Sequence, residues 1–283
     1  MTHFASWRAR SSALQTPHAY PPRSAALVLV AAAFVPLASC AGPSAETRAD
    51  TQYVARDVNT LYNLAKDQLD NGRYTTAAAL FAEVERQHPY SPWARRAQVM
   101  GAFSHYLARN YTEAIQASQR FLAIHPGNSE APYVHYLIAI SYYEQMSDVR
   151  RDQGVTFQAQ AALNELVRRY PQSEYAADAR LKLDLVNDHL AGKEMEIGRF
   201  YQRRRQWLAS TLRFRNVIDN YETTTHAPEA LMRLTESYLA LGIVEEARRS
   251  AAVLGANYPE TRWYTRAYEL MQEHGGITPA GAD

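Results

Sequence analysis

Only one cysteine, Cys40, occurs among the 283 residues of the chain. A single thiol cannot form a disulfide within the chain, so disulfides do not hold this fold together. The chain also lacks an excess of charge of one sign, because 30 Lys and Arg residues face 29 Asp and Glu residues. A strongly basic balance is the electrostatic footprint of a nucleic-acid-binding domain. The composition therefore argues against nucleic acid as a partner.

Long hydrophobic runs are also missing. The most apolar stretch, SAALVLVAAAFVPLAS at residues 24–39, follows Arg23 and is interrupted by Pro36. It is shorter than the roughly 20 apolar residues that a membrane-spanning helix needs. A basic region, a short apolar region and small residues are instead the plan of a secretory signal. We therefore expect residues 1–39 to be a signal peptide that is removed from the mature protein.

The end of this stretch explains the single cysteine. Residues 37–40 read LASC and resemble a bacterial lipobox, in which the signal peptidase cuts before a cysteine that carries lipid. Two or more acyl chains give a stable membrane anchor. We therefore expect Cys40 to be lipidated and residues 40–51 to form a flexible tether. The residue after the cysteine, Ala41, resembles the sorting signal that directs a lipoprotein to the outer membrane. An ordinary signal peptide with an incidental cysteine is the alternative.

Motifs that carry enzymatic chemistry are absent as well. The nine histidines are scattered, and none stands near cysteines or acidic residues at metal-ligand spacing. There is no G-x-S-x-G elbow, no H-E-x-x-H motif and no glycine-rich loop that could cradle phosphate. The sequence therefore predicts no enzymatic activity, no metal site and no cofactor.

What the sequence does contain is an internal repeat that ends on a proline. Each of four prolines follows a histidine or tyrosine, and the same four helical positions recur at fixed offsets before it. The second of the four positions is a small residue, which lets two helices cross closely. The residues four and seven positions beyond it share one buried face. Proline then ends the helix. The four sets are Tyr74, Ala77, Phe81 and Val84 before Pro89; Tyr111, Ala114, Ser118 and Phe121 before Pro126; Thr156, Ala159, Leu163 and Leu166 before Pro171; and Val244, Ala247, Ala251 and Leu254 before Pro259.

A glycine stands two residues before three of these sets, at Gly72, Gly154 and Gly242. Glycine tolerates the positive φ of a helix C-terminal cap, so we expect each to end the preceding helix. The interval from Pro171 to Pro259 has room for a fourth, degenerate repeat. Its residues are Trp207, Ser210, Phe214 and Val217, with Glu222 in place of proline.

This pattern resembles the tetratricopeptide repeat, a helix–turn–helix unit of about 34 residues. We therefore expect an all-α fold, a right-handed superhelical solenoid of about five repeats with a concave groove for an extended partner. The segment from Ser173 to about Gln206 would be one long helix, or two helices broken near Gly192. A generic helical bundle with chance prolines is the alternative.

The densest charge cluster is GRFYQRRRQW at residues 198–207. It contains Arg199, Arg203, Arg204 and Arg205. These side chains form either a solvated helix face or a contact surface for an acidic partner, because guanidinium groups pair well with carboxylates. The sequence leaves both interpretations open.

Three stretches add a family resemblance. HPYSPWA at 88–94, RDQGVTFQA at 151–159 and RRYPQSEYA at 168–176, together with the lipobox and the repeats, resemble the BamD family of the outer-membrane β-barrel assembly machinery. The resemblance covers roughly residues 52–272. It implies a scaffold on the periplasmic face of the outer membrane, not an enzyme.

The resemblance also implies a division of labour along the chain. Repeats 1–2, in residues 52–127, would receive unfolded outer-membrane proteins. Repeats 3–5, in residues 128–272, would dock on the POTRA domains of a BamA-like insertase, alongside the other lipoproteins of this machinery. Residues 273–283 would form a flexible tail. A tetratricopeptide lipoprotein that acts as an adaptor for peptidoglycan hydrolases or cell division is the alternative function.

Individual residues are assigned by position in the family. Arg213 matches the family's basic contact to BamA, and we group Arg203, Arg204 and Arg205 with it as the partner-binding set. The substrate-receiving set contains four residues whose alternative explanation is turn formation and core packing. They are Tyr62, Tyr90, Pro92 and Trp93.

Overall fold

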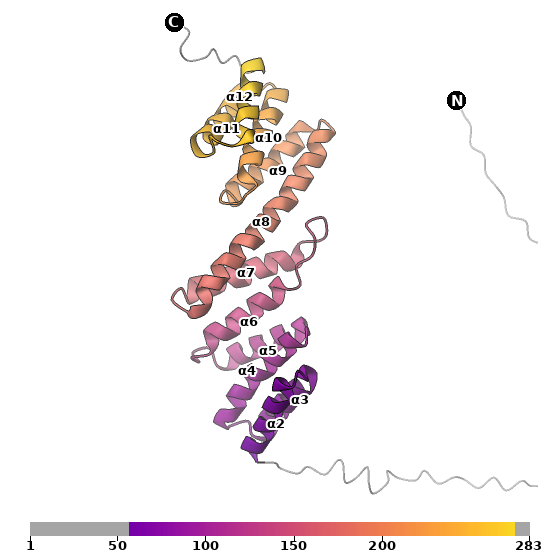
Figure 1. Cartoon of the computed structure of the whole chain (residues 1–283), viewed down its shortest axis with the longest axis vertical. Coiled ribbons are helices and arrows are strands. Elements are labelled where there is room, and N and C mark those ends of the chain that lie inside the picture. Colours follow the sequence, from indigo (N-terminus) through magenta and orange to yellow (C-terminus); the bar gives the residue numbers. More distant parts are fainter. Residues whose placement is uncertain (1–56, 275–283) are drawn as a thin grey trace, which may run out of the picture. The chain divides into compact units, whose positions relative to one another are not determined.

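The computed structural model describes residues 57–274, and this part of the chain contains eleven α-helices and no strand (Figure 1). The predicted signal peptide 1–39, Cys40 and the tether 40–51 lie outside the described residues. So does most of the predicted tail 273–283, although the last helix continues to His274.

The helices form five consecutive pairs followed by one closing helix. Each helix packs on the next along the chain, and α2 also packs on α4, α4 on α6, and α6 on α8. This is the expected all-α helical repeat array. The helices are α2 (Val58–Asp70), α3 (Tyr74–Gln87), α4 (Pro92–Leu107), α5 (Tyr111–Ile124), α6 (Ala131–Tyr143), α7 (Gly154–Arg169), α8 (Glu174–Arg203), α9 (Trp207–Asn220), α10 (Ala227–Ala240), α11 (Val244–Asn257) and α12 (Arg262–His274).

The predicted repeat positions form the core of the array. The small residue of every second helix is fully buried: Ala77, Ala114, Ala159, Ser210 and Ala247 are each 0% exposed. The large residue seven positions later is buried in all five helices as well. The recurring spacing in the sequence therefore marks the face on which each second helix meets its neighbours.

Each second helix ends at the same register, whether or not proline follows. The last residue before the break is a histidine or tyrosine whose N–H donates to the carbonyl four residues back, as in His88 and Tyr170. Tyr221 does the same before Glu222, which replaces proline in the fourth repeat. Proline therefore reinforces this helix end, but the fold does not depend on it.

The fourth repeat begins with one unbroken helix, α8, which is 30 residues long. Gly192 and Gly198 lie within it and are buried. A Cβ added at Gly198 would collide with the Phe214 ring, so the glycine permits the close approach of α8 and α9. Of the two sequence-based alternatives, the single long helix is correct.

Four of the five turns within the helix pairs share one backbone geometry, with a residue of positive φ. Gly72 and Gly242 have φ of 73° and 75°, as predicted for C-terminal caps. Arg109 and Arg205 occupy the equivalent positions with φ of 60° and 58°. A residue with a Cβ pays about 1–2 kcal/mol for this conformation. Two turns therefore hold a strained arginine where the geometry favours glycine.

The prediction for Gly154 is wrong. The helix before it, α6, already ends at Tyr143, and Gly154 is the first residue of α7. The ten residues 144–153 form a longer loop, and the N–H of Gly154 donates to the Asp152 carboxylate at 3.0 Å. Gly154 thus starts a helix whose N-cap is Gln153, because the third repeat lacks the short turn of the others.

Arg109→Gly is expected to raise the free energy of unfolding by about 1 kcal/mol, because it removes the strain of the positive φ. Arg205→Gly should behave in the same way. Urea unfolding of both variants measures the effect. Arg120→Gly, in the middle of α5, is the opposite control and should destabilise by about 1 kcal/mol. Equal destabilisation by all three substitutions would contradict this account.

Candidate functional site

An open pocket of about 950 Å³ lies between the first and second repeats. Tyr62 of α2 and Pro92 and Trp93 of α4 line it, so the structure brings together three of the four residues in the predicted substrate-receiving set. Gly127–Glu130, in the turn before α6, close another side. We call this cavity the N-terminal pocket.

Two aromatic rings form the pocket's apolar wall. The ring centroids of Tyr62 and Trp93 are 4.7 Å apart, and Tyr62 also packs at 5.4 Å on the buried ring of Phe81. Burial raises the pKa of Tyr62, and the nearby charge of Arg96 partly opposes this. Both rings are partly buried and partly open to the pocket, so core packing and ligand contact are compatible roles for them.

Tyr90 does not belong to this pocket, because it is 100% exposed in the turn before α4. Two residues that the sequence analysis did not select do line it, namely Arg95 and Arg96. The Arg96 guanidinium carbon lies 5.6 Å from the centre of the Trp93 ring. The doublet begins two residues after Trp93 in the sequence, and this proximity was the signal that could have identified it. The pocket thus combines an aromatic wall with two cations.

The predicted partner-binding arginines occupy two places. Arg203, Arg204 and Arg205 are exposed at the end of α8 and in the following turn. The Arg204 guanidinium carbon lies 4.2 Å from the centre of the Phe200 ring, which is 41% exposed. This turn therefore presents cations beside an exposed aromatic ring, a combination that is common in protein interfaces.

Arg213 lies elsewhere, about 9 Å along α9 from its first residue, Trp207. Its Nη1 donates to both carboxylate oxygens of Glu194, at 3.2 and 3.4 Å. The Arg213 side chain is 43% exposed, whereas that of Glu194 is 16% exposed. Two long contacts from a half-exposed guanidinium contribute little stability, so Arg213 can exchange this partner at modest cost.

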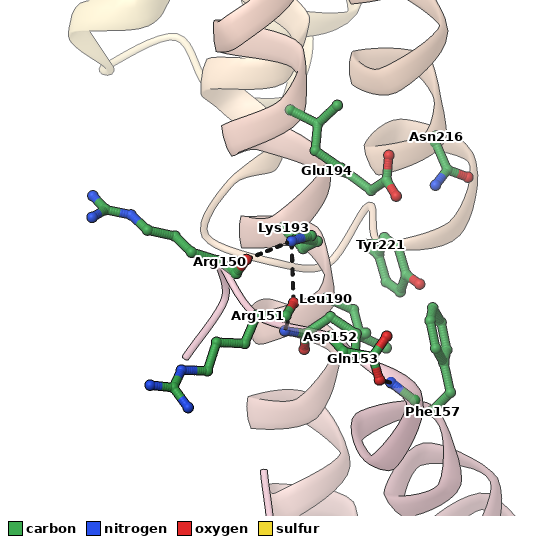
Figure 2. Close-up of a pocket in the computed structure, with 12 residues that line it drawn as sticks. Arg150, Arg151, Asp152, Gln153, Phe157, Leu190, Lys193, Glu194, Asn216 and Tyr221 are labelled. Atoms are coloured by element: carbon green, nitrogen blue, oxygen red, sulfur yellow. Dashed lines mark hydrogen bonds between the residues drawn. The ribbon is translucent and has the colours of Figure 1, made fainter. Parts of the chain in front are cut away.

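Glu194 lines a second open pocket, of about 700 Å³, between the third and fourth repeats (Figure 2). Phe157 and Tyr221 stand on one side of it. Lys193 donates to the backbone carbonyls of Arg150 and Arg151, both at 3.2 Å, and so ties the 144–153 loop to α8. Figure 2 shows the side chains of both arginines pointing away from the other labelled residues.

Arg199, the remaining member of the charge cluster, has a structural position. Its guanidinium donates to Glu229 of α10 at 2.9 and 2.5 Å, and Arg233 donates to the same carboxylate at 2.6 Å. Arg233 also reaches Gln202 at 2.6 Å, and Gln202 reaches Glu236 at 2.9 Å. These five side chains, here called the Glu229 network, join α8 to α10.

The charge of Glu229 is maintained by its partners. Burial alone would raise the pKa of Glu229, but hydrogen bonds from Arg199 and Arg233 outweigh burial and hold the pKa below its ordinary value. Arg199 fits neither interpretation from the sequence, because its side chain is only 22% exposed and is held by Glu229 and Glu196. Glu229 lies 30 residues away in the chain, and local spacing could not reveal this partner.

Two general features of residues 57–274 bear on function. No three His, Cys, Asp or Glu side chains in this range lie close enough to hold a metal ion together. Within the same range, no helix has both the length and the apolarity required to cross a bilayer. The predicted site residues in this range lie at the two pockets described above and in a set of exposed arginines.

The sequence matches a family model described as an outer membrane lipoprotein, YfiO, over residues 54–254. The chain belongs to the YfiO family. The matched range includes both pockets, the Glu229 network and every residue of the two predicted sets. It also covers all five helix pairs, up to Leu254 in α11.

Two curated relatives of this chain share one name, outer membrane protein assembly factor BamD. The Caulobacter vibrioides protein is 51% identical over 92% of this chain and 83% of its own length. The Rickettsia prowazekii protein is 43% identical over 81% of this chain and 91% of its own. Among solved structures, a tetratricopeptide-repeat protein of Thermus thermophilus matches 76% of this chain and all of its own, with 20% identity and a TM-score of 0.35.

Proposed function

We propose that this chain is the BamD-type subunit of the outer-membrane β-barrel assembly machinery, a lipid-anchored scaffold without catalytic activity. The observation that carries the proposal is the 51% identity, over 92% of the chain, to a relative named as an outer membrane protein assembly factor. The lipobox at LASC adds support, because a scaffold for outer-membrane insertion has to stand at that membrane. Cys40 carries the anchor on the periplasmic face.

The N-terminal pocket is the site for unfolded barrel proteins, here called clients. Its aromatic wall fits an apolar or aromatic client side chain, and Arg95 and Arg96 fit a carboxylate beside it. An extended client segment could place an apolar or aromatic side chain and a carboxylate close enough together to contact both parts of the pocket. Tyr62, Pro92 and Trp93 are the contact residues of this proposal, and Tyr90 stands outside the pocket.

The arginines of the fourth repeat are the docking site for the POTRA domains of a BamA-like insertase. Arg203, Arg204 and Arg205 are exposed cations, and Arg213 is held only by Glu194. An acidic insertase surface would replace Glu194 as the partner of Arg213. The scaffold would then hold a client at one end and the insertase at the other, which raises the effective concentration of the client at the insertase.

Arg213→Glu is expected to weaken copurification of the insertase by about tenfold or more, because the variant places two carboxylates beside the acidic partner. Affinity purification of the native protein, with quantification of the bound proteins, measures this. Arg248→Glu on α11 reverses a charge away from the proposed docking site and should leave the complex intact. Unchanged binding by Arg213→Glu would remove Arg213 from the docking site, and copurification of peptidoglycan hydrolases alone would overturn the proposed function.

A further inference from the structure

The arrangement of the helix pairs separates the turns of the array onto two edges. Helices alternate in direction, so the turns that follow α2, α4, α6 and α8 lie on one edge, at the right of Figure 1. The turn that follows α10, at 241–243, belongs to the same series and holds no arginine. The turns that follow α3, α5, α7, α9 and α11 belong to the opposite edge. We call the first the pair edge, because its turns lie within the helix pairs.

The pair edge carries seven arginines at or beside its turns. Among residues 57–274, none of the seven forms an ion pair with a carboxylate. The acidic residues there include Asp148 and Asp152, whose carboxylates accept backbone N–H groups of the loop. The arginines are Arg73, Arg109, Arg150, Arg151, Arg203, Arg204 and Arg205.

The opposite edge has the reverse character. Its turns, at 88–91, 125–130, 170–173, 221–226 and 258–261, contain no arginine or lysine and carry Glu130, Glu222 and Glu260. Some arginines in the adjoining helix ends are paired there, as Arg168 and Arg169 are with Glu165. Arg95, Arg96 and Arg262, at the starts of α4 and α12, have no such pair within residues 57–274, so the contrast between the two edges lies in the turns themselves.

Backbone strain is a second observation on the pair edge. Arg109 and Arg205 are the only residues other than glycine with positive φ between 57 and 274, and both lie on this edge. Glycine occupies the equivalent position in two sister turns without strain. Strain of this kind persists where a side chain has a use that offsets its cost. A guanidinium that projects from the pair edge is such a side chain.

We propose that the pair edge faces the membrane and contacts the headgroups of anionic phospholipids. Free arginines recur along this edge over four repeats, which suits an extended charged surface better than one compact protein contact. At the fourth turn, exposed Phe200 and Leu208 stand beside the arginines, and apolar groups next to cations are typical of interfacial contacts. The inference rests on the proposed anchor at Cys40, because the lipid brings this edge within reach of the bilayer.

The arginines act as a second, electrostatic attachment. Each one near an anionic surface strengthens the contact about fivefold. One lipid signal combined with a basic surface gives a stable and oriented attachment. Arg203, Arg204 and Arg205 lie at the end of the edge, where the insertase is proposed to dock, whereas Arg109, Arg150 and Arg151 are not among the proposed docking residues. Arg150 and Arg151 share a pocket with Glu194, so insertase copurification must be measured on the same variants to separate the membrane contact from docking.

Orientation can be measured on the native lipidated protein reconstituted into vesicles. The only natural cysteine is consumed by lipid under this proposal, so an introduced cysteine takes a fluorescent donor at one position. Asn71→Cys places the donor on the pair edge, and Tyr90→Cys places it on the opposite edge of the same repeat. Energy transfer to an acceptor lipid should be about twofold higher from Asn71, because α3 separates the two positions by about 20 Å.

The difference should appear in vesicles of phosphatidylcholine and phosphatidylglycerol in a two-to-one ratio and vanish in phosphatidylcholine alone. High salt should also abolish it, since the Debye length falls to about 3 Å at 1 M. The triple variant Arg109→Gln, Arg150→Gln, Arg151→Gln should lose the difference in energy transfer between the two edges. Glutamine also has a Cβ, so this variant keeps the backbone strain at position 109. The matched control on the opposite edge, Arg168→Gln, Arg169→Gln, Arg262→Gln, should retain the difference.

Equal transfer from both edges in the anionic vesicles would overturn the proposal. A triple variant that keeps its orientation yet loses a copurifying acidic protein would also overturn it, and would make the pair edge a protein-binding surface. Palmitate labelling that persists in Cys40→Ala would instead disprove the anchor. Insertase copurification, measured on the same variants, reports the proposed function independently of these results.

Discussion

Glu229→Ala is expected to lower the free energy of unfolding by about 3 kcal/mol, the largest loss that we predict for a single side chain in this array. The Glu229 side chain is 12% exposed, and those of Arg199 and Arg233 are 22% and 25% exposed. Removing the carboxylate leaves the largely buried Arg199 and Arg233 guanidinium groups without the counter-charge that they share, and only Arg199 keeps a second carboxylate partner, Glu196 at 2.8 Å. Urea unfolding measures the loss, and the melting temperature should fall by about 6–12 °C.

Hydrogen exchange should locate the damage. Because each repeat contacts only its neighbours, the amides of α9 to α12 should lose protection while those of α2 to α5 keep it. The matched control is Glu245→Ala, which breaks the Glu245–Arg248 pair, where the glutamate side chain is 71% exposed. It should cost less than about 1 kcal/mol. Equal losses in both variants would contradict a special role for the Glu229 network.

The contribution of the Glu229 carboxylate to stability also has a defined pH dependence. The pKa of Glu229 lies below its ordinary value of 4.5 in the folded state, so its ion pairs add stability that is complete well above pH 4.5. That stability is lost as the pH falls through the folded-state pKa. The difference between the parent and Glu229→Gln should therefore be largest near neutral pH and shrink on acidification.

The repeat architecture was predictable because it depends on local spacing. Ala77, Ala114 and Ala159 recur at fixed distances from a helix-ending residue, and each lies where two helices cross. Such a pattern is readable from a single sequence, because one repeat unit restates it several times. Gly154 was misassigned for the same reason, since its spacing fits the frame although the 144–153 loop changes its role.

The sites were less predictable because they join residues that are distant in the sequence. Arg199 and Glu229 are 30 positions apart, and no periodicity links α8 to α10. The N-terminal pocket likewise joins α2, α4 and the turn before α6. Positive φ at Arg109 was hidden too, because the residue type does not signal it. Tertiary contacts and backbone geometry, rather than composition, decide which charged side chains are free.

Trp93→Ala is expected to weaken client binding by about 30-fold, the loss typical of a central aromatic contact. The probe is a short peptide that ends in phenylalanine with a free carboxylate. Its ring would pack on the wall formed by Trp93 and Tyr62, whose centroids are 4.7 Å apart, and its carboxylate would face Arg96. Fluorescence anisotropy of the labelled peptide measures the affinity of the native protein and its variants.

Three comparisons separate recognition from folding. Tyr90→Ala, which removes a fully exposed ring outside the pocket, should bind the peptide like the parent. The same peptide with an amidated end should bind the parent about tenfold more weakly, because a charge-assisted hydrogen bond to arginine is lost. Arg96→Gln should abolish that discrimination between the two peptides.

Trp93 also packs on the core cluster that contains Leu61. Trp93→Phe keeps a ring in that position, so it should preserve both the melting temperature and most of the affinity. If Trp93→Ala melts like the parent and still binds the peptide unchanged, the aromatic wall serves packing alone and the client site lies elsewhere in the array.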